Sequence, residues 1–571
     1  MQHLDQRAQD SEIKSAALWH AGRVKTYLST LKKDHVFKDV WPTTDRGILG
    51  DLGRIASEAG AKPMPISAKT TVAGCIARMV DSGWWRKNLR RETLKENETV
   101  EHGAGLIRRK HQVYVSDHAS QIKRERAKAN RRTLEGLEVV SDCGEVVNLQ
   151  EAADASVSNP KLRRAELMTR CRGFEETAEF MGHKGLFLTL TTPSRFHRVN
   201  HAGLTNKKWD GATPRDGQDY LCKVWAKIRA AWKKKDLKAY GFRVAEPHHD
   251  ATPHWHILLF VPQEQTRELL AIAARYALAD CPTESGARKH RFTVKRIDPS
   301  QGSATDYIAK YIAKNIDGEK ETGEGIGLDF DSGTPAQTAA HRVKDWAGTW
   351  GIRQFQQVGG PSVTVWRELR RLGKGHEAAC QLELFEKPRA AASRGDWFAF
   401  WMVQGGPDVA RKDLTLKPFY VADDLGKYGD LVPKIKGVEG TDATGNFMEV
   451  TRLKTWTVQR AGLDTVNTLQ ADFDERMAWA KGNAGFVAAY ADAEFQRIGE
   501  AERTRTGINN CSHPTFDFSS FGADVDPTIY ATGEPRMGFP EDQEDVIDAS
   551  RREMDSYPDI SVEQYRIGPT H

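Results

Sequence analysis

The clearest pattern of hydrophobic and polar positions lies in the middle of the chain. Gly185–Pro193 is a short apolar run closed by proline, which predicts a buried β-strand. Tyr240–Glu246 and His254–Val261 predict two more strands, and the Pro-, His- and Asp-containing connection between them suits a hairpin. A fourth strand is expected near Arg291–Ile297, and helical spacing is found at Leu221, Trp225, Ile228 and Trp232, over Glu264–Ala279 and over Ala304–Asn315. Strands interspersed with helices, including an antiparallel hairpin, predict an α+β sheet domain.

The segment before this region is predicted to be mainly helical and strongly basic. Cations cluster at Arg86-Lys87, Arg90-Arg91, Arg108–Lys110, Lys123–Arg126 and Arg131-Arg132. A solvated helical surface would have the same composition. Trp84-Trp85 precedes the first cluster, however, and aromatic residues among arginines can stack on bases while the cations meet phosphates. We therefore expect this segment to contact DNA.

The patterns in the chain after Asn315 are weaker and predict fewer elements. A Gly-rich linker leads to a basic helical segment ending in Val365–Leu372, then come alternation over Phe447–Val458 and a helical stretch near Ala471–Gln496. From Phe521 onward there are twelve Asp and Glu against four Lys and Arg, which is typical of a disordered tail. The predicted layout is a basic helical region (1–180), a sheet domain (181–318), a linker with a basic helical segment (319–375), a mixed region (376–500) and an acidic tail (501–571).

Composition limits the classes of protein. The 571 residues exceed one hydrophobic core, so several domains are expected. No apolar run has transmembrane length and the N-terminus does not resemble a secretion signal, so a cytoplasmic protein without a membrane anchor is expected. The seven cysteines form no Cys-x-x-Cys pair, which argues against a zinc or redox motif. The net charge of +5 averages a basic N-terminal half and an acidic tail, and this asymmetry indicates a nucleic-acid partner.

Two histidines in the hairpin are the first candidates for chemistry. His254 and His256 are two residues apart, so on a strand both side chains leave the same face. Glu246, at the end of the preceding strand, would lie beside His254, and two imidazoles with one carboxylate leave positions open on a catalytic ion. Such a set accepts Mg²⁺ or Mn²⁺ when phosphate oxygens complete the shell. A surface or hydrogen-bonded histidine pair is the alternative, and His248, His249 and Asp250 in the loop are alternative ligands or DNA contacts.

The helix expected over Ala304–Asn315 places two phenols and two ammonium groups on one stripe, at Tyr307, Lys310, Tyr311 and Lys314. Three isoleucines form a second stripe that can pack against the sheet. A phenol with a pKa near 10 is a poor nucleophile, so it needs a metal-polarised phosphate and nearby positive charge. The tyrosines are therefore candidate nucleophiles, and the lysines are candidate stabilisers of developing charge. The alternative is a core helix with two amphipathic tyrosines.

Phe187–Thr191, Pro247–Phe260 and Tyr307–Asn315, in this order, resemble the three motifs of the HUH endonucleases. The likeness is to the two-tyrosine initiators, in particular the replication gene A proteins of temperate tailed phages, and Gly359–Trp366 also resembles the gene A type. The resemblance is specific over Gly182–Asn315.

This resemblance implies a HUH-type antiparallel sheet nuclease domain and rolling-circle replication. A metal-dependent endonuclease of this kind nicks one strand of a supercoiled origin, keeps the 5′ phosphate on a tyrosine, leaves a 3′ hydroxyl primer and later rejoins the strands. Carried over by motif, Tyr307 and Tyr311 are the nucleophiles and His254 and His256 are metal ligands. Glu246 is expected as the third ligand, although the position of this ligand varies within the superfamily. Residues expected to shape the site or touch DNA are Thr191, Pro193, Ser194, Phe196 and His197.

Other classes of protein remain alternatives. Plasmid relaxases place their tyrosine before the histidine motif, which is the reverse of the order here. A two-tyrosine transposase fits the order, although many carry a Cys-rich zinc module, and a non-catalytic origin-binding protein would leave no covalent DNA adduct. The chain has no Gly-x-x-x-x-Gly-Lys-Ser/Thr loop, so a helicase motor is not expected. The expected partners are supercoiled and single-stranded origin DNA with the host helicase, single-strand-binding protein and DNA polymerase, in the bacterial cytoplasm.

Overall fold

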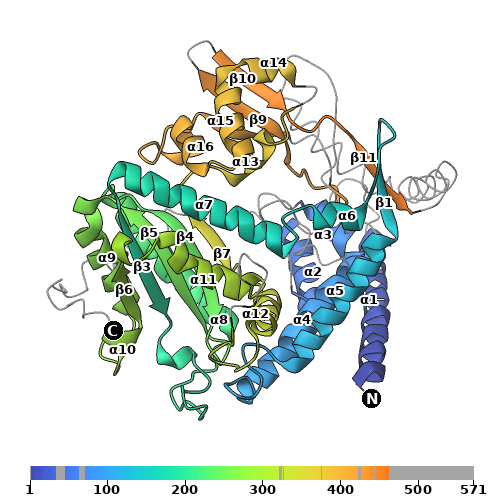
Figure 1. The fold of residues 1–571 in the computed structure, drawn as a ribbon. Helices are drawn as coiled ribbons and strands as arrows, with labels where there is room; N and C mark the ends of the chain where they lie inside the picture. Colours follow the sequence, from blue (N-terminus) through green and yellow to red (C-terminus); the bar gives the residue numbers. More distant parts are fainter. Residues whose placement is uncertain are drawn as a thin grey trace.

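The computed structural model describes residues 2–33, 45–62, 71–319, 325, 327–373, 376–421, 426–442 and 445–461. At its centre is a five-stranded antiparallel sheet in the order β6-β3-β5-β4-β7 (Figure 1). Its strands are β3 (Lys184–Thr191), β4 (Tyr240–Pro247), β5 (Pro253–Val261), β6 (Phe292–Arg296) and β7 (Phe355–Val358). The predicted α+β class and the β4–β5 hairpin are therefore confirmed.

Both faces of this sheet are covered by helices. Trp255, Ile257 and Leu259 of β5 pack on one face against α8 (Pro214–Lys234), α9 (Thr266–Leu278) and α12 (Ala336–Trp350). Leu258 and Phe260 point to the opposite face, towards α7 (Pro160–Met181) and α11 (Ala304–Ile316). Because successive side chains of a strand alternate between faces, His254 and His256 share the face of Leu258 and so face α11.

Helix α11 is tied to the sheet by its apolar stripe and to α7 by its first turn. Ile308, Ile312 and Ile316 are buried, as their spacing predicted. The Ser303 hydroxyl caps the helix by accepting from the Asp306 amide at 2.9 Å. Glu175 of α7 accepts from the Thr305 amide at 3.1 Å. A carboxylate near a helix N-terminus is favourable, so α7 helps to fix the position of α11.

Two elements beyond residue 318 also belong to this sheet layer. The short strand β7 pairs with β4, and α12 buries Val343, Trp346 and Trp350 against the sheet. The sheet core therefore draws on residues from both sides of the predicted boundary at 318.

The N-terminal helices form a core of their own. They are α1 (Gln2–Lys33), α2 (Asp45–Glu58), α3 (Val72–Met79) and α4 (Ser82–Gly103). By contrast, α5 (Asp117–Glu135) packs on the core of the central sheet through Ala119 and Ile122, and α6 (Leu149–Asp154) places Leu149 in a small separate cluster with Leu134 of α5. Trp85 has no exposed surface, and its indole donates to the Met79 carbonyl at 2.7 Å. The proposed stacking of Trp84-Trp85 on DNA is wrong for Trp85, because this ring is an interior residue. Trp84 packs edge-on against it with ring centroids 5.1 Å apart.

A third group of elements lies on the far side of α7 (Figure 1). Its helices are α13 (Val363–Leu369), α14 (Glu377–Gln381), α15 (Glu383–Arg394) and α16 (Trp397–Val403). Its antiparallel sheet has the order β10-β9-β8, from β8 (Leu416–Val421), β9 (Lys434–Asp442) and β10 (Gly445–Val450). Helix α16 approaches α7 closely at Gly173, where a Cβ would lie 2.5 Å from Trp397 Cβ.

The chain then returns to the N-terminal region. Strand β11 (Trp456–Arg460) pairs with β1 (Leu137–Ser141), which also pairs with β2 (Val146–Asn148). The remaining short elements are α10 (Ala287–His290) and single 3₁₀ turns at Ser194–Phe196, Gln263–Gln265, Pro299–Gln301 and Arg411–Asp413. The expected helix near Ala471–Gln496 and the acidic tail lie outside the described residues. Among the helices that are described, none has the length and apolarity to cross a membrane.

Candidate metal and tyrosine site

The hairpin brings the three predicted metal ligands together. Glu246 of β4 is the direct partner of His254 in the β4–β5 register, and His256 lies two residues further along β5. The two Nε2 atoms are 3.0 Å apart, and Glu246 Oε2 lies 4.0 Å from that of His254 and 3.7 Å from that of His256. Neighbouring ligands of an octahedral ion with bonds of about 2.1 Å are separated by about 3 Å. The donor set therefore fits one divalent ion after small adjustments.

The electrostatics of the three groups also suit a metal. Burial, together with nearby His248 and Lys314, holds the pKa of His254 well below its usual value. Burial and Lys314 lower the pKa of His256 to about 3. Both imidazoles are therefore neutral at physiological pH, which is the form that binds metal ions. Burial raises the pKa of Glu246 despite opposing contributions from Lys314, Asn315 and Lys310, so a cation in contact with this carboxyl would favour its ionised form.

Two residues that the sequence did not identify as functional orient these ligands. Thr189 Oγ1 lies 3.2 Å from His256 Nδ1, and a proton assigned to Nδ1 by this contact leaves the Nε2 lone pair directed at the site. Asn315 is 2% exposed; its amide donates to Glu246 Oε1 and, at 2.6 Å, to the Tyr311 carbonyl. Both residues lie inside motifs quoted above, but their roles depend on the β3–β5 register and on the packing of α11.

The two tyrosines occupy different surroundings. The ring of Tyr311 lies over His256, with centroids 4.1 Å apart, and stacks on Phe187 at 5.2 Å. Tyr307 lies one turn away, 6.4 Å from the Phe187 ring, with Lys295 Nζ 4.5 Å from its centroid. Burial and then Glu246 raise the pKa of Tyr311 to about 12. Tyr311 is therefore the phenol nearer to the predicted metal ligands.

The two lysines of the stripe also differ. Lys314 is largely buried, and its Nζ lies 3.4 Å from Asp329 Oδ1. Burial alone would lower the pKa of Lys314, but the carboxylates of Glu246, Asp329 and Asp331 outweigh it and raise that pKa. Lys310 is exposed on the same side of α11. Lys314 thus supplies a fixed charge close to the ligands, whereas Lys310 faces solvent.

The loop histidines and the residues after β3 surround this centre. His248 stacks on His254 with centroids 4.0 Å apart, while His197 Nδ1 lies 3.1 Å from the buried carboxylate of Asp250. Phe196 packs against Tyr220 with ring centroids 5.0 Å apart. Thr191 donates to the His290 carbonyl at 3.0 Å, and Ser194 donates to Glu284. These contacts shape the loops around the three ligands.

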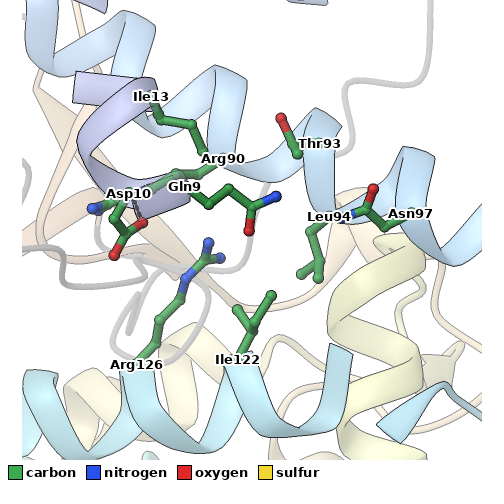
Figure 2. A pocket seen from close by; sticks show the side chains of 9 residues that line it. All are labelled: Gln9, Asp10, Ile13, Arg90, Thr93, Leu94, Asn97, Ile122 and Arg126. Atoms are coloured by element: carbon green, nitrogen blue, oxygen red, sulfur yellow. Dashed lines mark ion pairs between the residues drawn. The ribbon is translucent and has the colours of Figure 1, made fainter. Parts of the chain in front are cut away.

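Some cations of the basic region are used inside the fold. Arg90 and Arg126 line a small cavity between α1, α4 and α5 (Figure 2), and Arg90 Nε lies 3.2 Å from Asp10 Oδ1. Other cations remain on the surface of α5, where Arg124, Lys128 and Arg132 are exposed at i, i+4 and i+8. These three form one stripe available for phosphate contacts.

Comparisons with known proteins identify a family and several relatives. Residues 48–319 match the family described as Bacteriophage replication gene A protein. The chain is 40% identical over 391 residues to the "Replication gene A protein" of Escherichia phage 186, covering 68% of this chain and 56% of that protein. It is 37% identical over 395 residues to the protein of the same name from Escherichia phage P2, covering 67% and 51%.

A third relative carries a more specific name. The chain is 34% identical over 460 residues to a "Probable replication endonuclease from prophage-like region" of Salmonella typhimurium, covering 78% of this chain and 56% of the relative. The chain thus spans slightly more than half the length of these relatives. No solved structure matches it.

Proposed function

Because the chain belongs to the bacteriophage replication gene A protein family, we propose that it initiates replication by nicking one strand of origin DNA through tyrosine attack. The observation that carries this proposal is the position of the Tyr311 ring, 4.1 Å from that of His256, which lies in a group of donor atoms within 4.8 Å of one another. A candidate nucleophile and candidate metal ligands that are separate in the sequence thus lie next to one another, which supports the proposal.

We assign the metal-binding role to Glu246, His254 and His256. A bound Mg²⁺ or Mn²⁺ ion would polarise a phosphate and stabilise the charge that develops on its oxygens. Thr189 and Asn315 hold the ligands in orientation, and Lys314 adds positive charge beside Glu246. The site belongs to a HUH-type nuclease domain in this proposal.

The tyrosines perform the strand transfer. The phenol of Tyr311 gives up its proton as its oxygen forms a bond to phosphorus, the bond from phosphorus to the 3′ oxygen breaks, and that oxygen takes up a proton to become a 3′ hydroxyl. The 5′ phosphate stays on the tyrosine as a phosphodiester, so its energy is kept for the reverse transfer. Tyr307, one turn away and next to Lys295, is placed to accept a second DNA end, which would allow the cycle to close.

Peptide mapping of the covalent adduct tests this function. The unaltered chain is incubated with Mg²⁺ and a supercoiled plasmid carrying the phage origin, and the DNA-linked peptide is identified by mass spectrometry. We expect a 5′ phosphate on Tyr311 or Tyr307, reduced adduct for either single Tyr→Phe variant, and none for the double variant. Tyr276→Phe, on α9 across the sheet, is the matched control and should form the adduct normally.

Two results would contradict the proposal. A phosphate found on a residue outside this pair would exclude the tyrosine assignment. An unaltered, folded chain that binds origin DNA but forms no adduct would indicate a non-catalytic origin-binding protein.

A further inference from the structure

A tight turn beside the metal site holds an aromatic ring in solvent. Phe330 is 83% exposed, although it lies between Asp329, which is 6% exposed, and Asp331, whose side chain is 19% exposed. Leu328, 74% exposed, adds to the apolar surface of the same turn. Exposing a ring of this size has an unfavourable hydration free energy, so a ring held outward by a rigid turn suggests a binding role.

The turn is fixed by its own hydrogen bonds. The Asp329 amide donates to the Thr334 carbonyl at 2.8 Å, and the Gly333 amide donates back to the Asp329 carbonyl at 2.8 Å. The Asp329 carboxylate accepts from the Ser332 amide at 2.9 Å. These hydrogen bonds restrain the backbone on both sides of Phe330, so little conformational entropy would be lost when the ring binds a partner.

Side chains from outside the turn fix it to the active site. The Asp329 carboxylate accepts a hydrogen bond from the Tyr114 hydroxyl at 2.9 Å and lies 3.4 Å from Nζ of Lys314, a residue of α11. Tyr114 has a φ of 71°, a conformation that is costly for a residue with a Cβ and that its surroundings maintain. These contacts join the turn to α11.

Cationic side chains lie beside Phe330 together with the carboxylates of Asp329 and Asp331. The guanidinium of Arg109 lies 4.8 Å from the Phe330 ring centroid and is also paired with Asp331, so this charge orients the ring. Arg109 Nη1 lies 3.4 Å from His201 Nε2, and the His201 ring lies 6.3 Å from that of His249 in the loop between β4 and β5. Lys110, His111 and His201 are exposed in the same neighbourhood. An exposed π face next to a solvent-facing cation, here Lys110, is a combination that binds single-stranded nucleic acid.

We propose that Phe330, oriented by Arg109 and Asp331, is a stacking platform for a base of single-stranded DNA next to the cleaved phosphodiester. Its position near the cleaved bond rests on the proposed function, whereas its binding of single-stranded DNA does not. Base pairs of a duplex hide their faces within the stack, so the platform favours melted DNA over double-stranded DNA.

Fluorescence anisotropy with the full chain tests the platform. The probe is a labelled, mixed-sequence single-stranded oligodeoxynucleotide, measured with EDTA so that no cleavage occurs. Loss of one base–aromatic contact should raise the Kd of Phe330→Ala on the order of tenfold. Phe330→Tyr keeps the π face and should bind nearly as well as the unaltered chain. Phe180→Ala is the matched control, because Phe180 is 67% exposed at the C-terminal end of α7, at the opposite end of β3 from the site.

Several results would overturn the inference. A Kd for Phe330→Ala within twofold of the unaltered chain would do so, and loss of a protein partner in that variant would instead identify a protein-docking turn. Equal weakening of duplex and single-stranded binding would also contradict base stacking. The adduct assay separates this inference from the proposed function: an adduct without a Phe330 effect refutes the platform alone, and a Phe330 effect without an adduct refutes the nicking activity alone.

Discussion

Asn315 offers the sharpest test of how the site is built, because it joins β4, which carries Glu246, to α11, which carries the two tyrosines. Its amide donates to Glu246 Oε1 and to the Tyr311 carbonyl, and its own Oδ1 accepts from Gln354 at 3.4 Å. Asn315→Asp keeps the size of the side chain but replaces the donor with a second carboxyl group against Glu246. Asn315→Ala removes the donor without adding charge.

The expected loss follows from the hydrogen bond. A hydrogen bond to a charged group contributes about 1.5–3 kcal/mol, which corresponds to about 10- to 150-fold in an equilibrium constant. Loss of an outer partner of a metal ligand typically weakens metal affinity by about 10- to 100-fold. We therefore expect Asn315→Ala to weaken Mn²⁺ binding by about 10- to 100-fold. Asn315→Asp should weaken Mn²⁺ binding further, provided that the new carboxyl group does not itself bind the metal.

Isothermal titration calorimetry with Mn²⁺ measures this effect on the full chain, and circular dichroism checks that each variant is folded. His256→Ala, which loses a ligand, sets the lower limit of affinity. Asn130→Ala is the matched control, because Asn130 is 1% exposed in α5 and lies outside the site. If folded Asn315→Ala bound Mn²⁺ within twofold of the unaltered chain, the assigned role of Asn315 would be refuted.

Two further predictions concern the regions around the sheet. Changing Arg124, Lys128 and Arg132 to Gln should reduce the magnitude of the slope of log K against log salt for DNA binding by about 2 to 3. As a control, Lys233→Gln with Lys234→Gln at the far end of α8 should leave this slope nearly unchanged. An unaltered slope in the α5 variant would exclude this stripe as a phosphate contact. Asp430 accepts from the Thr71 amide at 3.2 Å and pairs with Arg78, so Asp430→Ala should destabilise the contact between α3 and the C-terminal segment by about 3 kcal/mol in urea denaturation. Lys427→Ala breaks the more exposed pair with Asp81 and should cost under about 1 kcal/mol; equal losses for the two variants would contradict the assignment.

The central sheet could be predicted because its strands carry strong local patterns. The apolar run at β3 and the apolar sides of β4 and β5 mark buried strands, and the Pro-rich connection between β4 and β5 marks the hairpin. That hairpin fixes the pairing of Glu246 with His254, so the proposed metal-ligand set follows from local pattern and register. By contrast, β7 is four residues long and has only one fully buried residue, so its place beside β4 is set by tertiary pairing.

The burial of Trp85 is a second case in which local sequence patterns did not predict the packing. Arginines next to tryptophans have the composition of a nucleic-acid surface, but Trp85 lies in the N-terminal core and Arg90 is turned towards Asp10. Composition cannot distinguish a cation on the surface from one paired inside. The residues that stay exposed, such as the stripe on α5, become identifiable only when the helices are packed.

The two tyrosines illustrate how packing adds information that periodicity lacks. On an isolated helix Tyr307 and Tyr311 are equivalent members of one stripe. The isoleucine stripe fixes the rotation of α11 on the sheet, and the bond from Asn315 to Glu246 fixes its position along the strand direction. Together they put Tyr311 against His256 and leave Tyr307 beside Phe187 and Lys295. The proposed order of attack therefore depends on the register between α11 and β5. A change in that register, and not only loss of a phenol, should alter which tyrosine carries the DNA.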